Sequence, residues 1–233
     1  MALLVVIEGI DGSGKGTQSA RLRDRLLARG LRADLLSFPR YEATFFGQRI
    51  GDFLNGRFGQ LSEVDPFLAS LLYAGDRLES KAELTRLLAE NDVLVLDRYV
   101  PSNIAHQAGK RTGARRRELA EWIEKIEYDL FGLPRPDLVV LLDIPAKNSQ
   151  ELIAKKDART YTTQAADIQE ADTDYLTRVR SAYRELAAER GWSIVSVVDA
   201  QGIRSMEALT AEIEQLVDLA LSSQSAAPPA KRP

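Results

Sequence analysis

The chain has 233 residues, 45% of them hydrophobic and 28% charged, and it contains no cysteine and one histidine. These proportions are typical of a soluble globular domain. The lack of cysteine excludes disulfides, thiolate metal sites and cysteine nucleophiles, and a single histidine excludes metal sites built from several histidines. The net charge of -3 gives no general attraction to nucleic acid or to a membrane surface, so we expect neither as a partner, and an anionic ligand must be held by a local cluster of basic groups.

Apolar runs and helical periodicities alternate along the chain. Leu3–Glu8 is a continuous apolar run that ends in an acid, which predicts a strand buried on both faces. Strands alternating with helices predict an α/β fold with a five-stranded parallel sheet covered by helices on both faces. The further strands are expected at residues 33–38, 93–96, 138–142 and 193–198, and the helices at 15–28, 45–54, 66–89, 104–110, 115–130, 172–190 and 205–221.

Two segments break this alternation. Residues 154–166 are polar and partly basic without a hydrophobic period, which predicts a mobile lid at about 154–168. The run SSQSAAPPAKRP at 222–233 has nothing to bury, so we expect a disordered tail after one domain at 1–221. No apolar run reaches the roughly 18 residues of a membrane-spanning helix, and no basic segment precedes the first strand, so we expect a cytoplasmic protein.

A glycine-rich loop follows the first strand and matches GxxxxGK. Glycines let the backbone wrap closely around a phosphate with its N–H groups inward, and the amino end of the next helix adds partial positive charge. Lys15, which we expect on a solvent-facing loop, would place its charge on the β- and γ-phosphates. An ordinary glycine-rich turn is the alternative, but the strand before and the helix after favour a P-loop NTPase fold of three layers. The predicted ATP-binding residues of this loop are Gly9, Ile10, Asp11, Gly12, Ser13, Gly14, Lys15, Gly16 and Thr17.

The residues expected to bind Mg²⁺ and to form a second phosphate-binding element lie at the start of the first helix and at the end of the third strand. Gly16 stands where a Ser or Thr hydroxyl usually binds Mg²⁺, so Thr17 is the nearest hydroxyl. Asp97 lies at the carboxyl end of a parallel strand, where it can hold Mg²⁺ or its waters. The adjacent Arg98 can bridge two phosphates bidentately. A strand-terminating salt bridge is the alternative, and the neighbouring P-loop favours the phosphate role.

Three motifs in order around the P-loop resemble those of thymidylate kinases, a family of nucleoside-monophosphate kinases. The string DRYVPSN at 97–103 is similar to that family's DRY motif, SFPRY at 37–41 to its FPRY segment, and LLYAGDR at 71–77 to its LLF-A-x-R helix. The resemblance covers the chain from Val5 to about Leu186. It implies ATP and dTMP as substrates, Mg²⁺ as cofactor, in-line transfer of the γ-phosphoryl group and, by analogy alone, a homodimer.

The resemblance also implies an acceptor site. Arg40 and Arg98 would clamp the acceptor phosphate. Tyr73, where the family usually has Phe, would stack on the base, and Arg77 one helical turn later would read it. His106 stands where the family usually has Tyr or Phe against the sugar, with a satisfied structural histidine as the alternative. The remaining acceptor residues implied by the resemblance are Phe38, Pro39, Ser102, Asn103, Gln107, Asp167 and Gln169.

The catalytic groups implied by the resemblance are Lys15, Arg98, Asp11 and a basic residue of the lid. The family places a catalytic arginine in the P-loop or in the lid, and the variable P-loop positions here are glycine and serine. Among the basic residues of the lid we prefer Arg159, because a guanidinium can span donor and acceptor oxygens. Asp11 would orient the acceptor or its arginines. Gln201 falls where these kinases wrap a loop around adenine.

Two alternatives differ in what receives the phosphoryl group. A kinase of deoxynucleosides would need a general base after the second strand, where this chain has Arg40, and a kinase of another monophosphate differs only in the acceptor base. A P-loop ATPase that acts as a conformational switch needs no acceptor pocket. The Tyr73, Arg77 and Arg40 set would then have no purpose.

Overall fold

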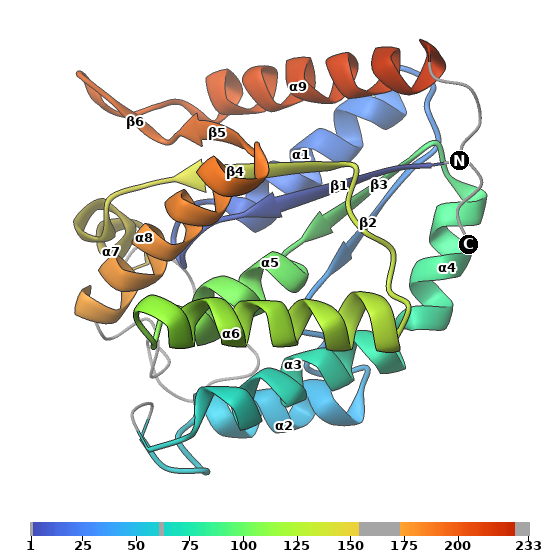
Figure 1. Cartoon of the computed structure of the whole chain (residues 1–233). Helices are drawn as coiled ribbons and strands as arrows, with labels where there is room; N and C mark the ends of the chain where they lie inside the picture. Colours follow the sequence, from blue (N-terminus) through green and yellow to red (C-terminus); the bar gives the residue numbers. More distant parts are fainter. Residues whose placement is uncertain (1, 61–62, 154–172, 227–233) are drawn as a thin grey trace.

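The structure is a computed structural model that describes residues 2–60, 63–153 and 173–226. At its centre five parallel strands form one sheet in the order β2-β3-β1-β4-β5 (Figure 1). The predicted α/β fold with a five-stranded parallel sheet is confirmed. The strands are β1 (Leu3–Glu8), β2 (Ala33–Ser37), β3 (Val93–Asp97), β4 (Leu138–Asp143) and β5 (Ser193–Ser196).

Strand β1 lies in the middle of the sheet and is completely buried. Val5 is paired with Val95 of β3 on one side and with Leu138 of β4 on the other. The chain leaves β1 and β3 at the same edge of the sheet, since parallel strands end together. Ligands of open parallel sheets bind at this edge, where neighbouring strands continue into helices on opposite faces.

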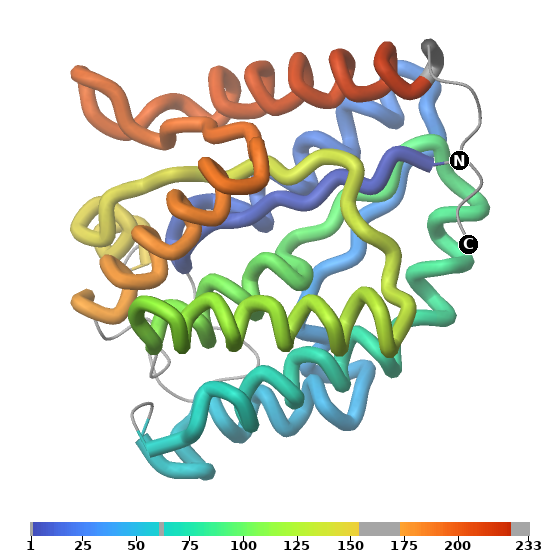
Figure 2. The backbone as a smooth tube through the Cα atoms, in the orientation of Figure 1, coloured from blue at the N-terminus to red at the C-terminus, as the bar shows by residue number. Residues whose placement is uncertain are grey.

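The helices form two layers (Figures 1 and 2). Helices α1 (Lys15–Ala28) and α9 (Met206–Ala226) lie on one face of the sheet. Helices α5 (Val100–Asn103), α6 (Gly113–Glu124) and α8 (Thr173–Arg190) lie on the other. Within the described part of the chain, no helix is long and apolar enough to cross a membrane.

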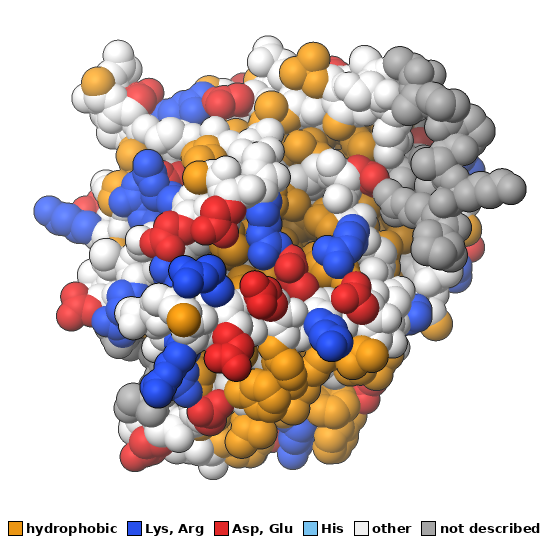
Figure 3. Space-filling view, viewed as in Figure 1, with side chains coloured by type: hydrophobic (Ala, Val, Ile, Leu, Met, Phe, Trp, Pro, Cys, Tyr) orange, Lys and Arg blue, Asp and Glu red, His pale blue; other side chains and the backbone are white. Residues whose placement is uncertain are grey.

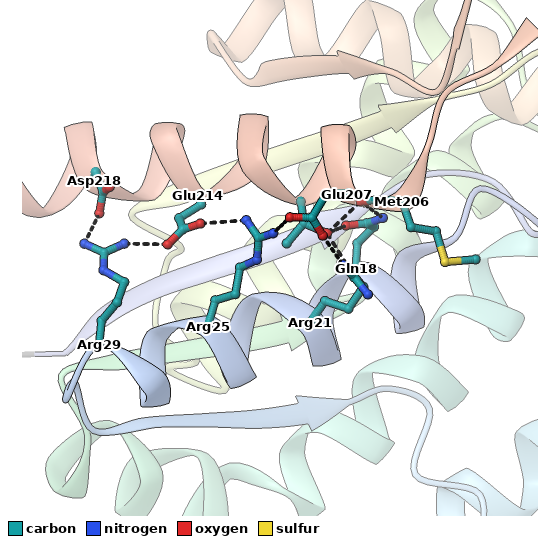
Figure 4. Close-up of polar contacts among 9 residues, drawn as sticks. Gln18, Arg21, Arg25, Arg29, Met206, Glu207, Glu214 and Asp218 are labelled. Carbon is teal, nitrogen blue, oxygen red and sulfur yellow. Dashed lines mark hydrogen bonds and ion pairs between the residues drawn. The ribbon is translucent and has the colours of Figure 1, made fainter.

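Helices α1 and α9 are joined by a row of ion pairs (Figure 4). Arginines spaced one helical turn apart on α1 face carboxylates on α9, as in the pair between Arg29 and Asp218 at 2.8 Å. Exposed pairs contribute at most about 1 kcal/mol each, so the row chiefly fixes the relative position of the two helices. The participating residues are Arg21, Arg25, Arg29, Glu207, Glu214 and Asp218.

Helices α2 (Phe45–Leu54) and α3 (Pro66–Glu79) pack on each other beside the sheet. They have their own small apolar cluster around Ile50 and Phe53, separate from the main core. At Gly75 the two helices approach so closely that a Cβ would lie 2.6 Å from the Phe46 ring. Because this helix pair has its own apolar cluster, a cavity can lie between the pair and the main core.

The helix predicted at 66–89 is two helices, because α3 ends at Glu79 and α4 (Lys81–Glu90) begins after one intervening residue. Between them the buried Ser80 hydroxyl donates to the Asp76 carbonyl at 2.8 Å. Serine competes for backbone groups in this way and interrupts a helix without disturbing its apolar period.

Other boundaries also differ from the prediction. The strand predicted to reach residue 198 ends earlier and is followed by an antiparallel hairpin of β6 (Val198–Asp199) and β7 (Gly202–Ile203). Helix α9 runs through Ala226, so the disorder predicted for its last residues is wrong, and the rest of the tail lies outside the described residues. The predicted lid also lies outside them. The helices α5 (Val100–Asn103) and α7 (Ala146–Ile153) were not predicted, and parts of the helices predicted at 104–110 and 115–130 are π-helical, namely η1 (Ile104–Ala108) and η2 (Lys125–Leu130).

Candidate active site

The glycine-rich loop is held between β4 and α7. Gly9, Gly12 and Gly14 have φ of 146°, 77° and 88°, which side chains strongly disfavour. A Cβ on Gly9 would lie 2.6 Å from the Leu142 carbonyl, and one on Gly12 would lie 2.5 Å from the Ser149 carbonyl. Gly14 caps α1 without a side-chain bond, so no side chain of the cap blocks the amino end of that helix from an anion.

Lys15 is buried, contrary to the expectation of a solvent-facing position, and only 6% of the residue is exposed. Its Nζ donates to the Ile10 carbonyl at 2.8 Å, so the side chain folds back over its own loop. Burial, and next the positive charge of Arg98, lower the pKa of the Lys15 amine to about 7. An anion at the loop would reverse this effect, because it stabilises the charged amine.

Arg98 follows β3 with a left-handed backbone, φ 67°, which is uncommon for a residue with a side chain. Its Nη2 donates to Asp11 Oδ1 at 2.5 Å. Its Nη1 lies 3.3 Å from the Gly9 carbonyl and 3.2 Å from Ser102 Oγ. The guanidinium is thus held between the glycine-rich loop and α5, and its role in bridging phosphates stays a prediction.

Glu8, for which the sequence predicts no role in the site, anchors this turn from the end of β1. Its carboxylate is fully buried and accepts hydrogen bonds from the Tyr99 and Ser102 amides at 2.9 and 3.1 Å. It also accepts from the Ser102 and Tyr183 hydroxyls at 2.6 and 2.8 Å. Burial raises the pKa of Glu8, and these donors oppose the shift. The signal in the sequence was an acid that closes an apolar strand.

A cavity opens beside Arg98, between the main core and the α2–α3 pair, and its empty space, including its opening to solvent, is about 470 Å³. Its walls come from the glycine-rich loop, the segment after β2, helices α2 and α3, and the segment after β3. Most of the predicted acceptor residues meet here, although they are distant in sequence. The predicted residues that line it are Asp11, Phe38, Pro39, Tyr73, Arg77, Arg98, Ser102, Asn103, His106 and Gln107, and Tyr41 and Leu54 line it as well.

Glu127 organises one end of the cavity, and no local sequence signal pointed to it. It is fully buried in η2 and binds Arg77 through both Nε and Nη2, the latter at 2.7 Å. It also accepts from Asn103 Nδ2 at 2.9 Å, while the same nitrogen donates to the Ser70 carbonyl at 3.0 Å. Because both partners can only accept, the amide nitrogen must face them and Asn103 Oδ1 must face away.

Two amide side chains at the cavity are left with unpaired atoms. Asn103 Oδ1 and both polar atoms of Gln107 are buried and have no hydrogen-bond partner among the described residues. Leaving such an atom unpaired costs about 1 to 3 kcal/mol. Both residues line the cavity, so a ligand with complementary donors and acceptors would satisfy them.

Several predicted site residues are not brought into the cavity. Arg40 Nη1 donates to Ser80 Oγ at 3.3 Å, and Arg40 is not part of the lining. Gln201 is exposed at the turn of the β6–β7 hairpin, where its backbone N–H donates to the Asp199 carboxylate. The roles assigned to these two residues stay predictions. Arg159, Asp167 and Gln169 lie outside the described residues.

The residues predicted to bind a metal offer few ligands. Asp97 Oδ2 lies 3.1 Å from where a Cβ on Gly16 would stand, so the missing side chain leaves the carboxylate room beside α1. Thr17 is exposed one residue further on. Among the described residues no group of three or more acids or histidines could hold a metal ion by itself. One carboxylate and one hydroxyl fit Mg²⁺, which keeps several waters and takes phosphate oxygens as ligands.

The comparisons of this chain with known proteins agree on one family. A profile described as thymidylate kinase matches residues 7–213. A thymidylate kinase of Mycobacterium tuberculosis is 34% identical over 190 residues, which cover 82% of this chain and 87% of the relative. A probable thymidylate kinase of Thermococcus gammatolerans is 33% identical over 94% of this chain and 97% of its own length. The solved structure of a Candida albicans thymidylate kinase, 23% identical, has the same fold with a TM-score of 0.69 over 94% of this chain and 92% of its own.

Proposed function

This chain belongs to the thymidylate kinase family, and from that premise we propose that its glycine-rich loop binds ATP and its cavity binds dTMP. Membership makes the chain a phosphotransferase that phosphorylates thymidine monophosphate. In the proposed reaction, an oxygen of the dTMP phosphate forms a bond to the γ-phosphorus while the bond to the β-phosphate oxygen of ATP breaks, giving dTDP and ADP. Catalysis is mainly positioning and charge neutralisation.

The observation that carries the acceptor assignment is the unpaired Asn103 Oδ1 beside the Arg77 guanidinium, since Glu127 Oε1 accepts from both side chains. Asn103 Oδ1 offers an acceptor, and Arg77 Nη1 is the guanidinium nitrogen that Glu127 does not engage. Thymine presents N3–H beside the O4 carbonyl, which complements an acceptor next to a donor. Cytosine presents the reverse pattern at these two atoms, and its amino group would oppose Arg77. Tyr73 supplies a ring on which the base can stack.

The phosphates would meet three basic groups. Lys15 would leave the Ile10 carbonyl for the β- and γ-phosphates of ATP, and Arg98 would bridge donor and acceptor phosphates with Asp11 holding its other edge. Arg40 would join the clamp by rotating away from Ser80, a movement that a side chain on a loop can make.

Asp97 and Thr17 would hold Mg²⁺ together with phosphate oxygens and waters. When bound, the ion neutralises charge on the β- and γ-oxygens. We also propose a lid at 154–168 that supplies Arg159, with Asp167 and Gln169 facing the acceptor nucleoside. Gln201 would lie beside adenine. The cytoplasmic location stays a prediction.

We also propose a homodimer, through an apolar stripe on α3. Leu68 and Leu78 are 61% and 42% exposed on this helix, and Leu71 lies between them on the same face. Phe67 packs against Trp122 of the adjacent α6, with ring centroids 3.5 Å apart and ring planes tilted by 35°. Figure 3 shows hydrophobic side chains gathered on this lower part of the molecule. Such a stripe is self-complementary across a two-fold axis.

Release of ADP by the purified full chain tests the function. With Mg·ATP, we expect release to depend on dTMP and to be roughly a hundredfold slower with dCMP, as two mismatched hydrogen bonds require. Equal release without any acceptor would support an ATPase switch instead. Faster turnover of thymidine than of dTMP would support a deoxynucleoside kinase.

A further inference from the structure

The single histidine of the chain contacts Arg98 directly. His106 is buried in η1, with 6% of the residue exposed. Its Nε2 lies 3.4 Å from Arg98 Nη1, and its Nδ1 lies 2.9 Å from the Tyr175 hydroxyl. Tyr175 is buried in the first turn of α8, on the far side of the ring from Arg98. The imidazole therefore stands between a guanidinium and a phenol.

These partners determine the protonation state of the ring. A guanidinium can only donate, so Nε2 must be the bare nitrogen and Nδ1 must carry the proton. The Nδ1–H then donates to the Tyr175 oxygen, and the Tyr175 hydroxyl donates in turn to the His106 carbonyl at 3.5 Å. Burial, and next the charge of Arg98, lower the pKa of His106 to about 3, which agrees with a neutral ring.

We propose that His106 and Tyr175 are positioning residues for Arg98, with the Tyr175 oxygen accepting from Nδ1–H and so stabilising the histidine tautomer that accepts from the guanidinium. Arg98 Nη1 has two hydrogens, and the ring is the only acceptor that approaches it from η1 among the described residues. Asp11 holds Nη2 from the opposite side. Together they fix the direction in which the remaining donors of Arg98 face the acceptor phosphate.

This role differs from contact with the sugar, which the resemblance implied for position 106. The family usually has Phe or Tyr there, and a Phe ring offers no nitrogen to accept from Arg98. The inference rests on the proposed function, because there Arg98 binds the phosphate of dTMP. It predicts an effect that depends on that phosphate, whereas a sugar contact would act equally on thymidine and on dTMP.

The test compares binding of dTMP and thymidine to wild type and to Tyr175→Phe by calorimetry. Removing the hydroxyl keeps the ring in the core but takes away the acceptor of Nδ1–H, so the tautomer whose Nε2 accepts from Arg98 is stabilised less. We expect dTMP binding and kcat to fall about tenfold, the effect of losing one hydrogen bond to a charged group, with thymidine binding unchanged. Tyr128→Phe, which removes another buried tyrosine hydroxyl, is the matched control and should change neither.

A double variant separates the tautomer role from general packing. Glutamine at 106 presents an acceptor oxygen that needs no tautomer, so His106→Gln should keep most of the activity, and adding Tyr175→Phe should cost little more. Equal losses for thymidine and dTMP, or additive losses in the double variant, would overturn the proposal. A wild type that binds thymidine as tightly as dTMP and does not turn dTMP over would refute the proposed function itself, whatever the variants do.

Discussion

Several charged side chains around the cavity are buried. Glu8, Lys15, Arg77 and Glu127 are each less than 7% exposed. Burying a charge costs several kcal/mol unless it is paired and hydrogen-bonded. Glu8 and the Arg77–Glu127 pair are satisfied within the protein, whereas Lys15 has two neutral oxygens as acceptors. Lys15 is therefore the residue whose environment should change most when nucleotide binds.

Nucleotide binding should take up a proton above pH 7. The pKa of Lys15 is lowered to about 7, so about nine-tenths of the amine is neutral one unit above that value. Triphosphate oxygens stabilise the ammonium form, so a proton must come from solution. Calorimetry of ATP binding at about pH 8 in buffers of different ionisation enthalpy should detect an uptake close to one proton, and a smaller uptake at about pH 6.

Lys15→Arg is the matched control, because a guanidinium stays protonated at both pH values. An undiminished uptake in this variant would show that another group takes the proton. The same shift affects stability without ligand. Between pH 7 and 10.5 the unfolded chain keeps a Lys15 proton that the folded chain has lost, so the free energy of unfolding should rise with pH across this window.

At the scale of elements, α7 packs on the glycine-rich loop. Ser149 is fully buried, and its hydroxyl donates to the Asp11 carbonyl. Gly12 lies against the Ser149 carbonyl and the Ile153 side chain of the same helix. A short helix that the sequence pattern did not reveal thus fixes the backbone of the loop that would bind the phosphates.

Gly12→Ala should destabilise the ligand-free protein more than Gly14→Ala. Both positions have a left-handed backbone, which costs about 1 to 2 kcal/mol for alanine. At Gly12 the new methyl would also lie 2.5 Å from the Ser149 carbonyl and 2.9 Å from Ile153, whereas at Gly14 it would meet nothing within 4 Å. We expect a further loss of about 1 to 3 kcal/mol in urea unfolding. Equal losses would mean that α7 does not rest on the loop.

At the scale of the whole molecule, the cavity lies between two apolar clusters of different size. The main core surrounds the sheet, and the smaller cluster belongs to α2 and α3. One side of α3 packs inward on that cluster, while the stripe of Leu68, Leu71 and Leu78 faces outward. Covering this stripe would stabilise the wall that carries Tyr73 and Arg77, so assembly and acceptor binding would be linked through α3.

Leu68→Glu should convert a dimer into monomers. Burying a leucine contributes about 1.5 to 3 kcal/mol, and a two-fold interface contains each residue twice. A carboxylate in its place would lose this contribution and add desolvation. Sedimentation velocity at micromolar concentration measures the change. Leu219→Glu is the control, since Leu219 is 66% exposed on α9 across the sheet from α3. A monomeric wild type would contradict the proposed interface.

The sequence by itself determined the sheet, the glycine-rich loop and most of the cavity lining. Buried strands are encoded by apolar runs of neighbouring residues, and the P-loop is encoded by glycines at fixed spacing. The three motifs that resemble those of thymidylate kinases contain most of the predicted acceptor residues. Parallel strands then place the ends of β1 and β3 together, which explains why Asp11 and Arg98 meet although 87 residues separate them.

Only the tertiary structure decided how those residues are held. Glu127 reaches Arg77 across 50 positions, and Tyr175 reaches His106 across 69. It also turned Arg40 toward Ser80, buried Lys15 and placed α7 on Gly12. A periodic pattern reports which face of one element is apolar, but a buried hydrogen bond between two elements depends on their packing. Partners such as Glu127 and Tyr175, which orient site residues from another element, therefore leave no local signal in the sequence.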